Sequence, residues 1–171
     1  MAHSNKKIAI FCGSSFPKDK KFVEEIEAFV NQLFMKNDFG LVYGGAKIGI
    51  MGIVANAALK YSREVIGVMP TFLREREVHH ETLDQFIECE TMHERKEKMY
   101  EMADAFLILP GGFGTLDEFF EILTWKQLNQ HQKPIYILNV QNFFRHMVSQ
   151  IEVLKDVGFI KGLDEKLFTL V

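Results

Sequence analysis

Short apolar runs alternate along this chain with longer segments of helical periodicity. The runs are residues 8–12, 41–43, 64–69, 105–109 and 135–138, and residues 86–90 add an alternating segment. A strand that is apolar at nearly every position is buried on both faces, which is typical of a parallel sheet covered by helices. The pattern therefore predicts a doubly wound α/β domain, with helices on both faces of a mostly parallel sheet.

Helical spacing occupies most of the chain between those runs. It is clearest in residues 22–35, where apolar side chains starting at Phe22 fall on one stripe. Residues 71–84 form a polar, charged stretch, and residues 167–171 are either a short strand or a docking tail. The other predicted helices are residues 51–61, 92–102, 115–128 and 143–157.

The composition is that of a globular protein. Hydrophobic residues make up 47% of the 171 residues, which is too apolar for a disordered chain and suits one domain over residues 1–171. The 20 Lys and Arg against 23 Asp and Glu give a net charge of −3, which argues against a strongly basic nucleic-acid binder. Two cysteines make no disulfide framework, and no apolar run approaches a membrane span. We therefore expect a cytoplasmic protein without nucleic-acid or membrane partners.

Glycines follow three of the apolar runs, at Gly13, at Gly44 and Gly45, and at Gly111 and Gly112. In open α/β sheets, ligands bind beyond the carboxyl ends of the strands. Glycines there let the backbone turn sharply and approach a ligand closely. These three strand ends are the first candidates for a ligand site.

The segment 110–118 is the richest of the three. Its glycines precede a predicted helix, and the start of a helix offers unpaired N–H groups and a positive dipole end to a phosphate. A structural interpretation competes with this one: Thr115 as N-cap and Glu118 three residues later form a capping box. On spacing alone the cap is favoured, and the spacing does not make Glu118 catalytic.

The loop after residues 41–43 carries a weaker signal. It is not a Walker A loop, because Gly49 is followed by Ile50 and Met51 instead of Lys and Ser or Thr. Gly49 and Gly52 are as consistent with close packing of the following helix on the sheet as with ligand contact. Gly13 and Ser14 could also hold a polar ligand.

Residues 92–102 place two cations on an inward stripe. Helical geometry aligns Arg95 and Lys96 with the apolar side chains of Met92 and Met99. A charge there is expensive unless it is paired or meets an anion. Pairing with carboxylates is possible, but we favour ligand binding, because a guanidinium suits bidentate phosphate contact.

The remaining metal-binding and nucleophilic side chains point to no site of their own. The six histidines show no ligand spacing for a metal, so we expect solvated or capping roles and no metal site. Cys12, at a strand end, is expected to be a small core residue and not a nucleophile.

Together these motifs resemble the LOG ("lonely guy") family. Residues 110–118 read PGGFGTLDE and match its PGGxGTxxE signature, and residues 92–96 match its RK element. Residues 12–15 and 43–45 match its other landmarks, and the similarity extends over about residues 7–160. Ala46 departs from the pattern, because the family commonly has a third glycine there. The resemblance implies a Rossmann-like three-layer fold and a homodimer.

The resemblance also implies an activity and its residues. Family members cut the N-glycosidic bond of cytokinin or adenine nucleoside 5′-monophosphates, releasing base and ribose 5-phosphate, without a metal or organic cofactor. The catalytic pair falls on Arg95 and Glu118. A non-catalytic nucleotide or molybdenum-cofactor carrier of similar fold is the alternative. The implied substrate contacts are Glu77, Lys96, Gly111, Gly112, Phe113, Gly114, Thr115, Leu116, Asp117, Thr124, Gly13, Ser14, Gly44 and Gly45.

Overall fold

A computed structural model describes residues 6–74, 78–160 and 167–171. Its core is a seven-stranded sheet in the order β4-β3-β2-β1-β5-β6-β7, and all six strand pairings in the described residues are parallel. The doubly wound parallel sheet predicted from the sequence is confirmed. The strands are β1 (Lys7–Phe11), β2 (Gly40–Tyr43), β3 (Val65–Pro70), β4 (Gln85–Cys89), β5 (Ala105–Ile108), β6 (Ile135–Ile137) and β7 (Thr169–Leu170).

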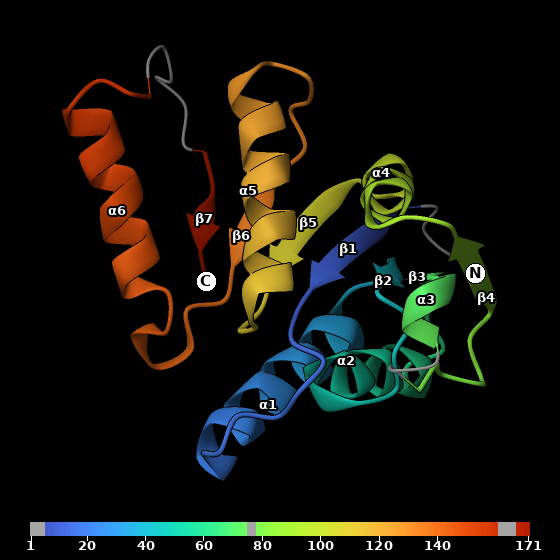
Figure 1. Ribbon diagram of the computed structural model, residues 1–171. Helices are drawn as coiled ribbons and strands as arrows, with labels where there is room; N and C mark the ends of the chain where they lie inside the picture. The colour runs from blue at the N-terminus through green and yellow to red at the C-terminus, as the bar shows by residue number, and fades with distance from the viewer. Residues whose placement is uncertain (1–5, 75–77, 161–166) are drawn as a thin grey trace.

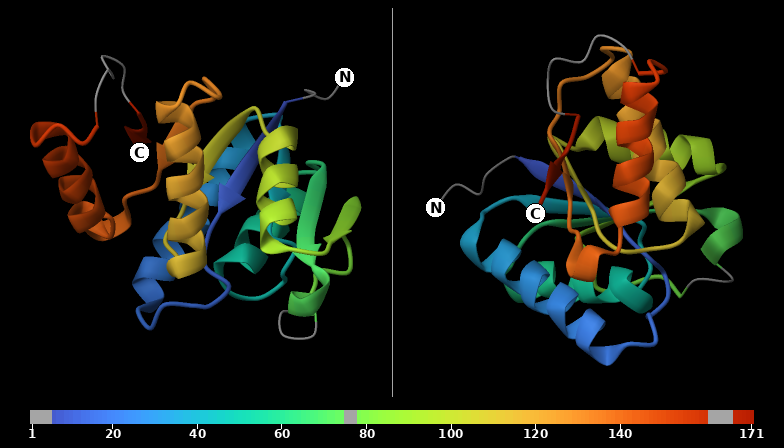
Figure 2. Two further views of the ribbon diagram at one scale, coloured as in Figure 1. Left: turned by 45° about the horizontal axis from the view of Figure 1, so that its top comes forward. Right: turned by 90° about the vertical axis from the view of Figure 1, so that its left-hand side faces the viewer.

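Helices cover both faces of this sheet (Figures 1 and 2). On β1, Ile8 and Ile10 belong to the core under α1 and α2, whereas Ala9 and Phe11 belong to the core under α4, α5 and α6. This alternation explains the unbroken apolar runs, because every side chain of β1 after Lys7 is buried. The helices are α1 (Lys20–Lys36), α2 (Gly49–Lys60), α3 (Thr71–Arg74), α4 (Met92–Met102), α5 (Phe113–Gln127) and α6 (Arg145–Asp156), with a 3₁₀ turn η1 (Val140–Asn142).

The strand order reverses between β1 and β5. The chain moves outward from β1 to β4, then returns to β5 on the other side of β1 and continues to β7. The loops after β1 and β5 therefore diverge to opposite faces and leave a crevice at the carboxyl edge of the sheet. The two loops touch where the Gly13 N–H donates to the Pro110 carbonyl at 3.2 Å.

The capping box predicted at Thr115 is wrong. Helix α5 begins at Phe113, its N-cap is Gly112, and no side chain of the described chain caps it. Thr115 is the third residue of the helix, and Glu118 lies in its second turn. The side chains of both residues are buried. The extended backbone of Gly112 lets the helix begin two residues before Thr115.

Two other expectations are settled by the fold, and one further element was not expected from the sequence. The C-terminal residues form a short strand, β7, because Thr169 and Leu170 pair with β6. The polar stretch 71–84 contains α3, one helical turn that the sequence reading missed. Gly49 does permit close packing, but against the backbone of Ser14 in the loop after β1 and not against the sheet.

Candidate active site

A pocket of about 360 Å³ lies at the carboxyl edge of the sheet and is lined by residues of α2 as well as of α4 and α5. We call it the central pocket. It gathers side chains and backbone from the loop after β1, from α3 and from the starts of α2, α4 and α5. Its lining residues are Cys12, Gly13, Ser14, Met51, Phe72, Leu73, Met92, Arg95, Gly112, Phe113, Gly114, Thr115 and Glu118.

The start of α5 opens into this pocket. A Cβ added at Gly112 or Gly114 would meet none of the described atoms within 4 Å, so space remains around these backbone units. The N–H groups of a first helical turn have no partner within the helix and attract anions. Phe113, between the two glycines, is 93% exposed at the pocket mouth. The segment can present main-chain donors to a phosphate.

Arg95 is only 6% exposed, yet its guanidinium reaches the central pocket. Its Nε donates to the Val68 carbonyl of β3 at 3.1 Å, and its Nη2 donates to the Gly44 carbonyl after β2 at 3.3 Å. Its Nη1 lies 3.8 Å from the Sδ of Met92. Main-chain carbonyls of β3 and of the loop after β2 thus fix the position of the cation. Its burial agrees with the inward stripe predicted for α4.

Glu118 lies across the same pocket on α5 and is 7% exposed. Thr115, one turn earlier, is buried and also lines the pocket. Burial raises the pKa of the Cys12 thiol, and the Glu118 carboxylate raises it further, while Arg95 acts in the opposite direction. Cys12 therefore stays a protonated thiol at neutral pH, in agreement with its expected role as a core residue.

Lys96 is bound differently from its neighbour Arg95. Its Nζ lies 3.0 Å from Asp117 Oδ2 and 3.1 Å from Glu121 Oε2, both on α5. Partial burial lowers the pKa of Lys96, but the hydrogen bonds to these two carboxylates outweigh that effect and raise it. Lys96 does not line the central pocket. In this structure it ties α4 to α5.

Several predicted substrate contacts lie outside the lining of the central pocket. Gly44 lies behind Arg95, and Gly45 accepts a hydrogen bond from the His80 N–H at 2.9 Å. The hydroxyl of Thr124 donates to the Phe120 carbonyl of its own helix at 2.6 Å. Glu77 falls outside the described residues. Gly111, Leu116 and Asp117 are also not among the lining residues.

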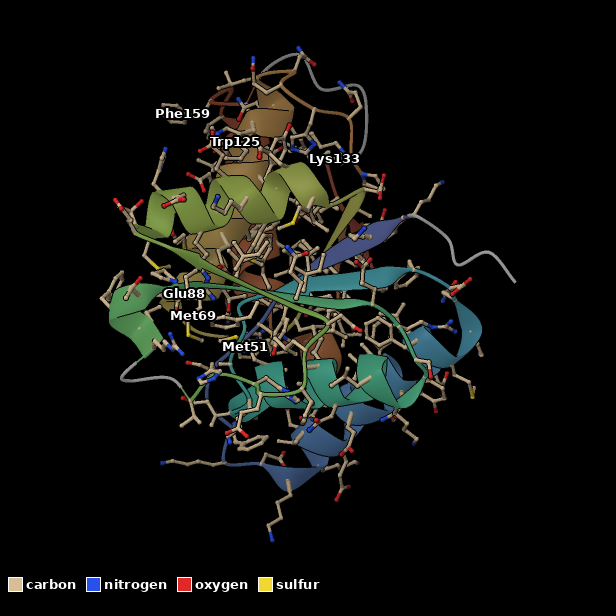
Figure 3. All side chains as sticks on the ribbon, turned by 90° about the vertical axis from the view of Figure 1, so that its right-hand side faces the viewer. Met51, Met69, Glu88, Trp125, Lys133 and Phe159 are labelled. Atoms are coloured by element: carbon tan, nitrogen blue, oxygen red, sulfur yellow. The ribbon has the colours of Figure 1, made fainter. Side chains whose placement is uncertain are left out.

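Apolar side chains form a wall of the pocket that the sequence analysis did not assign to a site. They are Met51, Phe72, Leu73 and Met92. Phe72 and Leu73 follow the end of β3, so the rule that ligands meet strand ends could have found them. Figure 3 shows Met51 on the α2 side of the sheet, while Trp125 and Lys133 lie on the α4 and α5 side.

The described residues offer neither a metal cluster nor a membrane-spanning helix. No group of three or more His, Cys, Asp or Glu side chains among them is placed to hold a metal ion. None of the helices in that part of the chain has the length and apolar character needed to cross a membrane.

Solved structures share this fold at low sequence identity. A molybdenum cofactor carrier protein of Chlamydomonas reinhardtii superposes with a TM-score of 0.69 and 17% identity, over 97% of this chain and 89% of that chain. A molybdenum cofactor binding protein of Rippkaea orientalis superposes with a TM-score of 0.58 and 18% identity, over 91% of this chain and 99% of that chain. Identities this low establish the fold alone.

Other proteins resemble this chain more strongly in sequence than these solved structures do. The family model described as "Possible lysine decarboxylase" matches residues 51–171. The cytokinin riboside 5′-monophosphate phosphoribohydrolase LOG7 of Arabidopsis thaliana is 40% identical over 162 residues, covering 95% of this chain and 74% of that protein. The corresponding enzyme LOG4 of the same plant is 42% identical over 154 residues, covering 90% and 71%. The chain belongs to the LOG family of cytokinin riboside 5′-monophosphate phosphoribohydrolases.

Proposed function

We propose that this protein hydrolyses the N-glycosidic bond of a nucleoside 5′-monophosphate, releasing the base and ribose 5-phosphate. One observation carries the proposal: buried Arg95 and buried Glu118 line one pocket together with the open start of α5. The relatives named above carry this activity in their names for cytokinin riboside 5′-monophosphates. The pocket volume of about 360 Å³ falls in the range of small-molecule sites.

The phosphate belongs at the start of α5. The amides of the first turn and the hydroxyl of Thr115 supply donors, and the helix dipole favours a negative charge there. A phosphate held at this point leaves the sugar within the pocket, beside the second turn of α5, where Glu118 lies.

Glu118 and Arg95 then share the chemistry of bond cleavage. The transition state of N-glycoside hydrolysis carries positive charge on the sugar, as in other glycoside hydrolysis. The Glu118 carboxylate stabilises that charge and orients or deprotonates the attacking water. Arg95 offsets negative charge that develops on the departing base, since its guanidinium is already fixed by the Val68 and Gly44 carbonyls. The step needs no metal or organic cofactor.

The apolar wall, formed by Met51, Phe72, Leu73 and Met92, receives the base. Adenine or an N6-prenylated adenine would both suit it, so we propose AMP as well as cytokinin nucleotides as substrates. We also propose that the protein is a cytoplasmic homodimer. Substrate contacts by Glu77, Lys96 and Thr124 rest on the family resemblance alone.

Purified protein incubated with AMP and with N6-prenylated AMP tests the activity, with chromatography of the released base. Glu118→Gln keeps the shape of the side chain and removes its charge, so turnover should fall by at least about a hundredfold. Arg95→Ala should also abolish turnover. Glu97→Gln, the same substitution at an exposed position of α4, should leave turnover unchanged.

The outcome also separates the enzyme from a carrier. Tight binding of AMP without release of adenine would overturn the proposal and favour the non-catalytic carrier. Full turnover by a folded Glu118→Gln variant would remove Glu118 from the chemistry. Circular dichroism of each variant checks that lost turnover does not come from unfolding.

A further inference from the structure

A second pocket of about 310 Å³ adjoins the central pocket. The two share the backbone of Gly13, Ser14 and Gly112, at the crossing of the loops after β1 and β5. The second pocket extends from this crossing to Phe22 of α1 and to Phe143, which follows η1. Its other lining residues are Ser15, Phe16, Pro17, Phe22, Ile50, Pro110, Gly111 and Phe143. We call it the aromatic pocket.

Two of its phenylalanines are unusually open to solvent. Phe16 is 60% exposed and Phe143 is 47% exposed, although both are large apolar side chains. Phe143 is held against Phe22 of α1, with ring centroids 5.7 Å apart. The aromatic pocket therefore offers ring surface to a ligand, and none of its lining residues carries a charge.

The backbone before Phe143 is strained. Gln141 and Asn142 both adopt left-handed conformations, with φ of 48° and 59°, which residues other than glycine rarely adopt. Hydrogen bonds hold this turn: the Phe144 N–H donates to the Asn139 side chain at 2.9 Å, and Gln141 Nε2 donates to Glu25 of α1 at 3.1 Å. Strain that the surroundings maintain at a pocket is a pointer to function. Here it fixes Phe143 at the pocket wall.

The orientation of the bound nucleotide indicates which of its groups faces each pocket. This step rests on the proposed function. With the sugar beside Glu118 and the phosphate at the start of α5, the base points away from Gly112, into the central pocket. The aromatic pocket then begins on the other side of the phosphate, since Gly112 lines both pockets. A group attached to the phosphate would enter it.

We propose that the aromatic pocket binds a second planar ring, joined to the nucleotide through its 5′-phosphate. The ligand class is the dinucleoside diphosphates, with one nucleoside in each pocket and the linking phosphates at the loop crossing. Aromatic side chains bind nucleobases by stacking, and switch points of doubly wound sheets accommodate dinucleotides across their crevice. The site is a specificity subsite beyond the phosphate.

Calorimetric titration tests this with three probes: AMP, ADP and diadenosine diphosphate, in which a pyrophosphate joins two adenosines. The Glu118→Gln variant serves as the background, so that the probes are not hydrolysed. ADP carries the second phosphate without a second ring, so it isolates the contribution of the ring. We expect diadenosine diphosphate to bind at least about tenfold more tightly than ADP.

Phe16→Ala in the same background should remove that gain and leave the dissociation constant of AMP unchanged. Phe143→Ala should likewise remove the gain in affinity and leave the dissociation constant of AMP unchanged. If the loss of the Phe143 ring disturbs the fold, the Phe16→Ala variant still tests the proposal, because Phe16 is the more exposed of the two. Phe159→Ala is the matched control, because Phe159 is exposed and does not line the pocket. It should leave the affinities for all three probes unchanged.

Equal affinity for ADP and diadenosine diphosphate would overturn the subsite and leave the proposed function intact. The subsite is also overturned if Phe16→Ala converts a dimer to a monomer on size exclusion without changing dinucleotide affinity, because the rings then form an interface between copies. No binding of AMP and no release of adenine by the unmutated protein would overturn the proposed function itself.

Discussion

The glycine loops after β5 and β2 look alike in the sequence, but they have different surroundings in the structure. At the start of α5, Gly112 and Gly114 have open space where a side chain would begin. After β2, a Cβ at Gly44 would overlap Arg95 Nη2 and lie 2.7 Å from Met51 Sδ. One loop is open toward a ligand, and the other is crowded by the guanidinium that faces the ligand.

The difference shows that a glycine at a strand end has two distinct uses. At Gly112 the missing side chain leaves room for a molecule that comes from outside. At Gly44 it leaves room for a buried cation of the protein, whose Nη2 donates to the Gly44 carbonyl. Substitutions in the two loops should therefore affect different quantities.

Gly44→Ala should have the largest effect. The added methyl group displaces the Arg95 guanidinium, and a misplacement of about 1 Å in a catalytic group can lower the rate about a hundredfold. We expect kcat for AMP to fall by about that factor, measured at saturating substrate. Gly112→Ala is the matched control and should keep kcat. Equal kcat values for the two variants would contradict the division of roles.

Gly49→Ala tests the packing of the β2 loop against the loop after β1. Gly49 has φ of +61°, and a Cβ there would overlap the backbone of Ser14. Left-handed strain and a backbone clash together should lower the free energy of unfolding by about 3 kcal/mol. Urea denaturation measures this loss. A loss below about 0.5 kcal/mol would show that the loop after β1 moves aside easily.

Lys96→Met tests whether the cation next to Arg95 ties two helices together. Loss of the ammonium group leaves the largely buried Glu121 without this partner, which should lower the free energy of unfolding by about 1–2 kcal/mol. The KM for AMP should change less than about threefold, because Lys96 does not line the central pocket. A large, salt-dependent rise in KM would show instead that Lys96 contacts the phosphate.

The pH dependence of this effect follows from the raised pKa of Lys96. A lysine whose pKa is higher in the folded protein stabilises it fully below the pKa of the unfolded chain, about 10.4. The contribution disappears as pH rises through the folded value. The stability difference between Lys96→Met and the unmutated protein should therefore persist at neutral pH and shrink in strongly alkaline solution.

The sequence predicted the sheet, the longer helices and the polar part of the central pocket, because burial and strand-end position follow from local patterns. It did not predict α3 or the apolar wall. The sequence could not distinguish the binding partners of Arg95 from those of Lys96, since both residues lie on the inward stripe of α4. Their partners come from β2, β3 and α5, which are distant in sequence. The capping box failed for a related reason: a Thr-x-x-Glu spacing does not reveal that Gly112 begins the helix earlier.

Gly114→Ala should have the smallest effect on the fold and still disturb binding. Its Cβ would meet none of the described atoms, and alanine is a better helix former than glycine, so the free energy of unfolding should change by less than about 1 kcal/mol, if anything upward. The methyl group nonetheless enters the space proposed for the phosphate, so KM for AMP should rise severalfold while kcat changes little. Gly44→Ala should show the reverse, with kcat as the quantity that falls. If Gly114→Ala lowers stability and leaves KM unchanged, the open space at the start of α5 does not hold the phosphate, and the two loops differ only in how tightly they pack.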